Sequence, residues 1–226
     1  MGYYGNANPD LLALLPTDAA SVLEIGGGDG AMARAYRVKN PDVRYYGVEI
    51  VPDVAAVGQG DFNHLVIGDV ENVADVAALD QARGDLQFDV LVIGDVLEHL
   101  HDPWAVMKTL RARMAPGGRG FVCIPNVGHW SLILKQMRGD WVYTDQGLLD
   151  KTHLRFFTKQ TATAMFEQSG WTVTATRPRV FKPEQGQSVV NALSDLAGRA
   201  GIPITQVREN LLPLQWVFSL KVSGDT

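Results

Sequence analysis

Short apolar, β-branched segments alternate along the chain with longer amphipathic segments. Parallel strands need long crossovers, usually helices, and strands covered by helices on both faces are apolar throughout. The alternation therefore predicts an α/β fold around an open parallel sheet, and 226 residues suffice for a sizeable core. The expected strands are Ser21 to Ile25, Arg44 to Ile50, His64 to Ile67, Phe88 to Ile93, Gly120 to Ile124, Thr172 to Phe181 and Leu214 to Val222.

Two helices have clear start and stop signals. Asp102 offers an N-cap before Pro103, and Pro116-Gly117-Gly118 would end that helix. Thr158 caps a second expected helix, which would end at Gly170. The residues expected on the buried faces are Met107, Leu110 and Met114 in the first helix and Ala162, Met165 and Phe166 in the second.

The charge balance limits the class of partner. The chain has 20 Lys+Arg and 25 Asp+Glu, a formal charge of -5, so no global positive field would attract nucleic acid or an anionic membrane. The sequence contains no run of about 18 apolar residues, so we predict no membrane-spanning helix. The single Cys123 lies in an apolar run, and residues 1–6 lack the basic and apolar regions of a signal peptide. We expect a cytoplasmic protein with a small-molecule substrate.

A glycine-rich loop, Gly26 to Gly30, follows the first expected strand and precedes a helix. In open α/β sheets such loops bind nucleotide-like ligands, because glycines allow tight turns and close approach of the ligand to the backbone. The spacing Gly26-x-Gly28-x-x-Ala31, with Glu49 at the end of the second strand, also satisfies the dinucleotide fingerprint. The spacing alone does not decide which nucleotide-like ligand binds.

Acidic residues near the loop favour a cationic ligand. A dinucleotide would place its pyrophosphate where Glu24 and Asp29 add two carboxylates, although Asp29 has an alternative role as a helix N-cap. S-adenosylmethionine carries an ammonium and a sulfonium and no phosphate, so these carboxylates would attract it. Asp69, after the third strand, offers an acceptor to an adenine amino group, and Asp95 follows the fourth strand beside the same crevice.

Together these residues resemble the class I S-adenosylmethionine-dependent methyltransferases. The loop from Glu24 to Gly30 is similar to the first motif of that family, Glu49 to its ribose-binding acid and Asp69 to its adenine-binding acid. The resemblance implies S-adenosylmethionine as cofactor. It also implies a Rossmann-like seven-stranded sheet in the order 3-2-1-4-5-7-6, with helices on both faces and the last strand, Leu214 to Val222, antiparallel.

By this resemblance residues 1–226 form a single domain, in which 1–20 are an N-terminal cap over the cofactor and 126–157 and 182–213 are substrate-side insertions. The last insertion is expected to hold a helix near 189–200 and to act as a lid, a dimer contact or a packing element, and a homodimer is left open. The cofactor-binding residues that the resemblance implies are Tyr4, Glu24, Gly26, Gly28, Gly30, Glu49, Ile50, Asp69, Val70 and Asp95.

The segment from Leu149 to Thr158 resembles bacterial members of the family that act on sugars, glycans or other small polar metabolites. Transfer of a methyl group to a hydroxyl needs a group that removes the hydroxyl proton. We expect His153 to be this base, because an imidazole titrates near neutrality, and Asp150 to orient it. Arg155 is expected to hold an anionic substrate group. Alternatively, His153 is a hydrogen-bonded loop histidine, and Arg155 pairs with a surface acid.

Asp95, Glu98 and His99 stand at i, i+3 and i+4, so on a helix they could face one divalent cation. We instead expect Asp95 on the loop beside the cofactor, and we predict no metal. The predicted reaction moves a methyl group from S-adenosylmethionine to a hydroxyl of a small polar metabolite or sugar. The alternatives are an amine acceptor, an NAD-dependent oxidoreductase and a non-catalytic regulatory module that binds S-adenosylmethionine.

Overall fold

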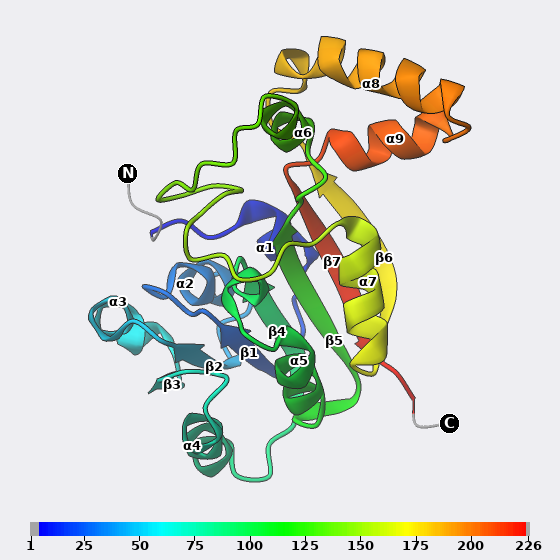
Figure 1. Cartoon of the computed structure of the whole chain (residues 1–226). Coiled ribbons are helices and arrows are strands. Elements are labelled where there is room, and N and C mark those ends of the chain that lie inside the picture. The colour runs from blue at the N-terminus through cyan, green and yellow to red at the C-terminus, as the bar shows by residue number, and fades with distance from the viewer. Residues whose placement is uncertain (1–4, 225–226) are drawn as a thin grey trace.

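A seven-stranded sheet forms the centre of the computed structural model, which describes residues 5–224 (Figure 1). The strand order is β3-β2-β1-β4-β5-β7-β6, which confirms the predicted order. The strands are β1 (Ser21–Ile25), β2 (Arg44–Glu49), β3 (His64–Ile67), β4 (Phe88–Gly94), β5 (Met114–Pro125), β6 (Trp171–Arg179) and β7 (Gln215–Val222).

Strand direction sets where a ligand can bind. β1 pairs in parallel with both β2 and β4, whereas β7 runs antiparallel to both β5 and β6, as predicted. The strand order reverses beside β1, because the chain continues from β1 to β2 on one side and only later returns to β4 on the other. In such sheets a crevice opens outside the carboxyl ends of the strands at this point.

Helices cover both faces of the sheet. α1 (Pro9–Leu14), α2 (Ala31–Arg37) and α3 (Pro52–Gly58) pack in one core layer, and α4 (Val73–Arg83), α5 (Pro103–Arg111) and α7 (Lys159–Gln168) pack in the other (Figure 1). Neighbouring strand residues face opposite layers, so Val22 belongs to the first layer and Leu23 to the second. This two-sided burial explains why the central strands β1 and β4 are apolar at successive positions.

Three helices lie beyond the carboxyl end of the sheet: α6 (Trp130–Met137), α8 (Gln187–Arg199) and α9 (Ile204–Leu211) (Figure 1). The start of α8 packs tightly against α6, since a Cβ on Gly186 would lie 2.3 Å from Nε1 of Trp130. Short 3-10 turns are η1 (Gln59–Asp61), η2 (Leu97–His99) and η3 (Pro183–Gln185). Within residues 5–224 no helix combines the length and apolar character needed to cross a membrane.

One predicted helix boundary is wrong. The helix that begins after Asp102 ends at Arg111, and Met114 lies in β5, paired with Phe88. Pro116-Gly117-Gly118 does not end a helix but forms an irregularity in β5, where the β4–β5 register shifts. The helix capped by Thr158 is confirmed, with its three predicted apolar residues buried.

Candidate functional site

The glycine-rich loop adopts a backbone conformation that requires glycine. Gly26, Gly28 and Gly30 have φ angles of +75°, +55° and +78°, which side-chain-bearing residues rarely adopt. A Cβ on Gly26 would also lie 2.4 Å from Cγ2 of Val96, which follows β4. The loop therefore lies directly against the β4 side of the crevice.

Glu49 holds this loop from the end of β2. Its Oε2 accepts a hydrogen bond of 2.8 Å from the backbone amide of Gly28, and its Oε1 accepts one of 2.9 Å from that of Val51. The side chain is buried. The carboxylate thus links the glycine loop to the loop that follows β2.

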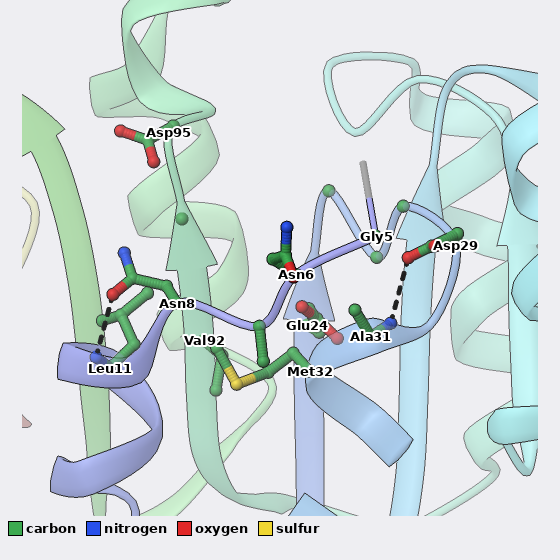
Figure 2. Close-up of a pocket in the computed structure, with 15 residues that line it drawn as sticks. Gly5, Asn6, Asn8, Leu11, Glu24, Asp29, Ala31, Met32, Val92 and Asp95 are labelled. Carbon is green, nitrogen blue, oxygen red and sulfur yellow. Dashed lines mark hydrogen bonds between the residues drawn. The ribbon is translucent and has the colours of Figure 1, made fainter. Parts of the chain in front are cut away.

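A cavity of about 210 Å³ lies at this loop, and we call it the loop cavity. Glu24 of β1 and Val92 of β4 line it from the sheet, and the N-terminal segment that carries Gly5, Asn6 and Asn8 runs across these strands (Figure 2). Residues 5–8 and Leu11, from the segment predicted as an N-terminal cap, line the cavity, whereas Tyr4 lies outside the described residues. The lining residues are Gly5, Asn6, Ala7, Asn8, Leu11, Glu24, Gly26, Gly27, Gly28, Asp29, Ala31, Met32, Val92, Gly94 and Asp95.

Glu24 is a buried acid in the wall of the loop cavity. Burial raises its pKa to about 8; the Tyr45 hydroxyl opposes this rise, and the negative charges of Glu49 and Asp29 add to it. Among the described residues, no hydrogen-bond donor meets Oε2 of Glu24. A cation in the cavity would stabilise the ionised form of this carboxyl group.

Among the predicted cofactor residues that the structure describes, Gly30, Glu49, Ile50, Asp69 and Val70 do not line the loop cavity. Gly30 caps α2 and lies against Asp61, where a Cβ would come within 2.6 Å of Oδ2. Ile50 follows β2 and is 61% exposed, and Asp69 follows the neighbouring β3 and accepts a hydrogen bond from the amide of Glu71. Val70 is buried in the core.

A second cavity, of about 240 Å³, adjoins the first, and we call it the histidine cavity. Asp95 lines both cavities. Segment 126–157 supplies four lining residues, whereas no described residue of 182–213 lines either cavity. The lining residues are Asp95, Glu98, Pro125, Gly147, Leu148, Asp150, His153, Phe181, Leu214 and Gln215.

Asp95 has a strained backbone and a fixed side chain. Its φ is +54°, a left-handed conformation uncommon outside glycine, and its amide donates to the carbonyl of Cys123. The Gln215 amide donates to its carboxyl group, and Arg179 donates in turn to Gln215. Burial raises the pKa of Asp95 to about 6, while the charge of Arg179 opposes this rise. Hydrogen bonds therefore fix both the backbone and the side chain of Asp95 at the junction between the cavities.

His153 is buried in the wall of the histidine cavity. Its Nδ1 lies 3.4 Å from the carbonyl oxygen of Leu148, and its Nε2 lies 4.0 Å from Oε1 of Glu98. Burial and the charge of nearby His99 lower the pKa of His153. The ring is therefore neutral near pH 7, with Nδ1 protonated towards Leu148 and Nε2 free to accept a proton.

Asp150 organises the turn that carries His153. Its Oδ1 accepts hydrogen bonds from the amide (2.8 Å) and hydroxyl (2.7 Å) of Thr152, and its carbonyl accepts one from the amide of His153. Burial alone would raise the pKa of Asp150, but the two hydrogen bonds from Thr152 lower it. Arg155 lies outside the residues that line the cavities and donates to the carbonyls of His101 and Leu154.

Glu98 is a site residue that the sequence pointed to only as a metal ligand. It is 1% exposed and lines the histidine cavity, and burial together with the charge of Asp95 raises its pKa well above the ordinary value. Its carbonyl accepts the amides of Leu154 and Arg155, which docks the histidine segment onto η2. The sequence signal that could have identified Glu98 as a site residue is its position shortly after β4, at the carboxyl edge of the sheet.

Donor atoms of Glu98, His99 and His153 lie within 4.8 Å of one another, a grouping of types that a divalent cation could use. Asp95 is not in this group among the described residues. The helical spacing considered for Asp95, Glu98 and His99 fails because Asp95 has a positive φ and η2 begins only at Leu97.

Comparisons with known proteins agree with this geometry. A family model described as a methyltransferase domain matches residues 4–176. A ubiquinone biosynthesis O-methyltransferase from Paraburkholderia phymatum is 32% identical over 98 residues, which is 43% of this chain and 40% of that protein. The chain thus spans less than half the length of this curated relative.

Solved structures share the fold. A SAM-dependent methyltransferase from Archaeoglobus fulgidus has a TM-score of 0.60 and 18% identity, over 91% of this chain and 87% of that one. An S-adenosylmethionine-dependent methyltransferase from Mesorhizobium loti has a TM-score of 0.60 and 14% identity, over 94% and 96%. The sheet order, the loop cavity and the family match lead to one conclusion: the chain belongs to the class I S-adenosylmethionine-dependent methyltransferases, with S-adenosylmethionine as cofactor.

Proposed function

We propose that this protein transfers a methyl group from S-adenosylmethionine to a hydroxyl of a small polar metabolite or sugar. The observation that carries the proposal is the junction at Asp95, which lines both the loop cavity and the histidine cavity. A cofactor in the loop cavity would present its sulfonium methyl at this junction. An acceptor in the histidine cavity would then lie next to the methyl group, as an in-line displacement needs.

The residues around the loop cavity suit the parts of the cofactor. Glu24 faces the cavity with a carboxyl group that a cationic ammonium would ionise. Gly26 and Gly28 leave room for close approach, and Glu49 is proposed to bind the ribose hydroxyls beside the loop that it holds. We further propose that Ile50, after β2, and Asp69 and Val70, after β3, receive the adenine. Asp95 would border the methyl group. Gly30 of the glycine loop and Tyr4 of the N-terminal cap would complete the cofactor site.

His153 is proposed as the base that accepts the hydroxyl proton. Its Nδ1 faces the carbonyl of Leu148, so Nε2 is the nitrogen available to the acceptor. Asp150 supports this role by fixing the turn instead of touching the ring with its carboxylate. Arg155 is proposed to steady the same segment through its bond to His101, because its side chain lies outside the cavity where an anionic substrate group would sit.

The remaining parts of the proposal concern organisation. The chain is treated as one domain in which 126–157 shapes the acceptor cavity and 182–213 is a lid, a dimer contact or a packing element. Small molecules are the proposed partners, since a net charge of -5 disfavours nucleic acid, and a cytoplasmic location and a homodimer are part of the same proposal.

An amine acceptor is the second candidate. The carboxyl groups of Asp95, whose pKa is about 6, and Asp150, whose pKa is lowered, line the histidine cavity, and near pH 7 they would attract a cationic amine. The hydroxyl stays the first candidate, because an alcohol always needs a base such as His153, whereas an amine needs one only when it arrives protonated.

The test incubates the purified protein with S-adenosylmethionine and paired acceptors that differ only in a hydroxyl or an amine, such as cyclohexanol and cyclohexylamine. Mass spectrometry then measures S-adenosylhomocysteine and the methylated product. The proposal expects acceptor-dependent release with the methyl group on oxygen. Methylation confined to nitrogen would favour the amine alternative, and cofactor binding without turnover would favour a regulatory module.

A further inference from the structure

Arg179, the last residue of β6, joins residues of three other elements. Its Nε donates a hydrogen bond to Asp10 of α1, and its Nη1 donates one to Gln215 of β7. The same Nη1 lies 3.9 Å from Sγ of Cys123 in β5. The side chain is only 13% exposed, so the protein surrounds most of the guanidinium. A charge withdrawn from water in this way needs partners, and here they come from both sides of the site.

The bond to Asp10 leads to the loop cavity. Asp10 lies in the first turn of α1, and its backbone amide donates to the side chain of Asn8, the N-cap of that helix. Asn8 belongs to segment 5–8, which lines the loop cavity (Figure 2). Arg179 therefore ties the start of α1, and with it the segment that crosses the loop cavity, to the edge strand β6.

The bond to Gln215 leads to the junction between the two cavities. The carbonyl oxygen of the Gln215 side chain accepts from Arg179, and its amide nitrogen donates to Oδ1 of Asp95. A guanidinium only donates and a carboxylate only accepts, so an amide between them is oriented in one way. The guanidinium also lies 5.1 Å from the ring centre of Phe181. Gln215 and Phe181 line the histidine cavity, and Asp95 lines both cavities.

We propose that Arg179 is a positioning residue that couples the two cavities, because one guanidinium holds both the segment over the cofactor and the wall of the acceptor cavity. In the described part of the chain Arg179 lines neither cavity, so it acts through Asp10 and Gln215. The inference rests on the proposed function, which places the methyl group beside Asp95. A cofactor that orders segment 5–8 should thereby also fix the acceptor side of the junction.

The shape of the guanidinium suits this role. Its nitrogens lie in one plane at fixed angles, so the bonds from Nε and Nη1 set the relative positions of Asp10 and Gln215. A lysine ammonium keeps the charge but donates from a single nitrogen, so it cannot keep both bonds in their original directions. A methionine keeps an apolar stem and loses both bonds. The two substitutions therefore separate the charge from the two-sided geometry.

A purely structural role for Arg179 is the alternative. Its carbonyl accepts the amide of Leu214, a β6–β7 contact that a side-chain substitution leaves in place. The side chain of Asp10 is 53% exposed, so its truncation should cost little stability. Asp10 lines neither cavity among residues 5–224. An effect of Asp10 on the reaction therefore has to pass through its contacts.

The test measures binding and turnover in the same variants. Calorimetric titration gives the Kd of S-adenosylhomocysteine. The kcat at saturating S-adenosylmethionine is measured with cyclohexanol or cyclohexylamine, whichever the native protein methylates faster. The variants are Asp10→Ala, Arg179→Met, the double variant and Arg179→Lys. Arg177→Met is the matched control, because Arg177 is an exposed arginine on the same strand. Melting temperatures are recorded for all of them.

We expect Asp10→Ala to raise the Kd about fivefold or more and to lower kcat by a similar factor, with a native melting temperature. Arg179→Met should lose at least as much in both quantities. The double variant should match Arg179→Met, because both substitutions remove the same contact. Arg179→Lys should recover part of both losses, and Arg177→Met should equal the native protein.

Three results would overturn the inference: an unchanged kcat in Asp10→Ala, additive losses in the double variant, or no recovery in Arg179→Lys. If neither compound is methylated, the proposed function fails instead. Amide hydrogen exchange of residues 180–182 and 212–215 then tests the coupling without an acceptor. Saturating S-adenosylhomocysteine should slow this exchange in the native protein and not in Asp10→Ala, and equal slowing in both counts against the inference.

Discussion

Glu49 at the end of β2 accepts a hydrogen bond from the backbone amide of Gly28, with 2.8 Å between nitrogen and Oε2. The residue that the family resemblance assigns to the ribose therefore also fixes the loop on which the cofactor lies. Its second oxygen accepts the amide of Val51. Loop conformation and cofactor binding consequently depend on the same carboxylate.

Replacing Glu49 should weaken cofactor binding. Glu49→Ala removes both backbone hydrogen bonds and the proposed ribose contact, so the Kd for S-adenosylmethionine should rise by at least about tenfold. Glu49→Gln keeps one acceptor oxygen, so its Kd should lie between those of the native protein and Glu49→Ala. Calorimetric titration measures the effect, with exposed Glu167→Ala as control. An unchanged Kd in Glu49→Ala would remove Glu49 from the cofactor site.

Binding of the cofactor should release a proton from Glu24. The pKa of this carboxyl group is about 8 in the free protein, so at pH 7 it is mostly protonated. A bound ammonium stabilises the carboxylate and lowers its pKa, and the proton leaves. The binding heat at pH 7 should therefore differ between phosphate and Tris buffers, and the difference should vanish in Glu24→Gln. Equal heats in both buffers for the native protein would refute the assignment.

His153→Ala should lower turnover and leave cofactor affinity unchanged. Loss of a general base costs about 10² to 10⁴ in kcat, whereas His153 does not line the loop cavity. Burial lowers the pKa of His153, so the unprotonated base forms at a lower pH than in an ordinary histidine. The native rate should therefore rise with pH through a midpoint below 6.5, the ordinary histidine pKa, and stay constant above it. Stopped assays across pH check this limb. A full rate in the variant, or a midpoint above 6.5, would exclude His153 as the base.

Two glycines near the loop allow a matched comparison. A Cβ on Gly58 would lie 2.3 Å from the backbone carbon of Asp29, whereas one on Gly60 has nothing within 4 Å. Gly58→Ala should force the glycine loop to move, which should cost about 1–3 kcal/mol of stability and weaken cofactor binding. Gly60→Ala should change neither. Thermal melts and titrations of both variants test this, and equal behaviour of the pair would show that the contact does not constrain the loop.

The sequence predicted the sheet well, because its signals are local. The central strands β1 and β4 are short apolar runs, and the resemblance supplied the strand order that the structure confirms. The error at Met114 arose because the helical spacing from Met107 continues by chance beyond Arg111. Burial of Met114 at the start of β5 produces the same apolar character as burial on a helix. Periodicity alone does not separate the two.

The site was less predictable, because its contacts join distant segments. Asp150 and His153 are spaced for a helical turn, but the Asp150 carboxylate instead caps a turn at Thr152. Glu98 is a buried, unpaired acid, and the backbone amide of Leu154 donates to its carbonyl, which brings the segment that carries His153 against η2. Such a pairing between η2 and a segment more than fifty residues later has no local sequence signal.

The most direct test of the account is to locate the transferred methyl group. The protein is supplied with S-adenosylmethionine labelled with ¹³C in its methyl group and with paired hydroxyl and amine acceptors such as cyclohexanol and cyclohexylamine, and carbon NMR identifies the atom that carries the label. The account predicts an O-methyl signal that depends on His153. Label found only on nitrogen, or an O-methyl signal that persists in His153→Ala, would contradict it.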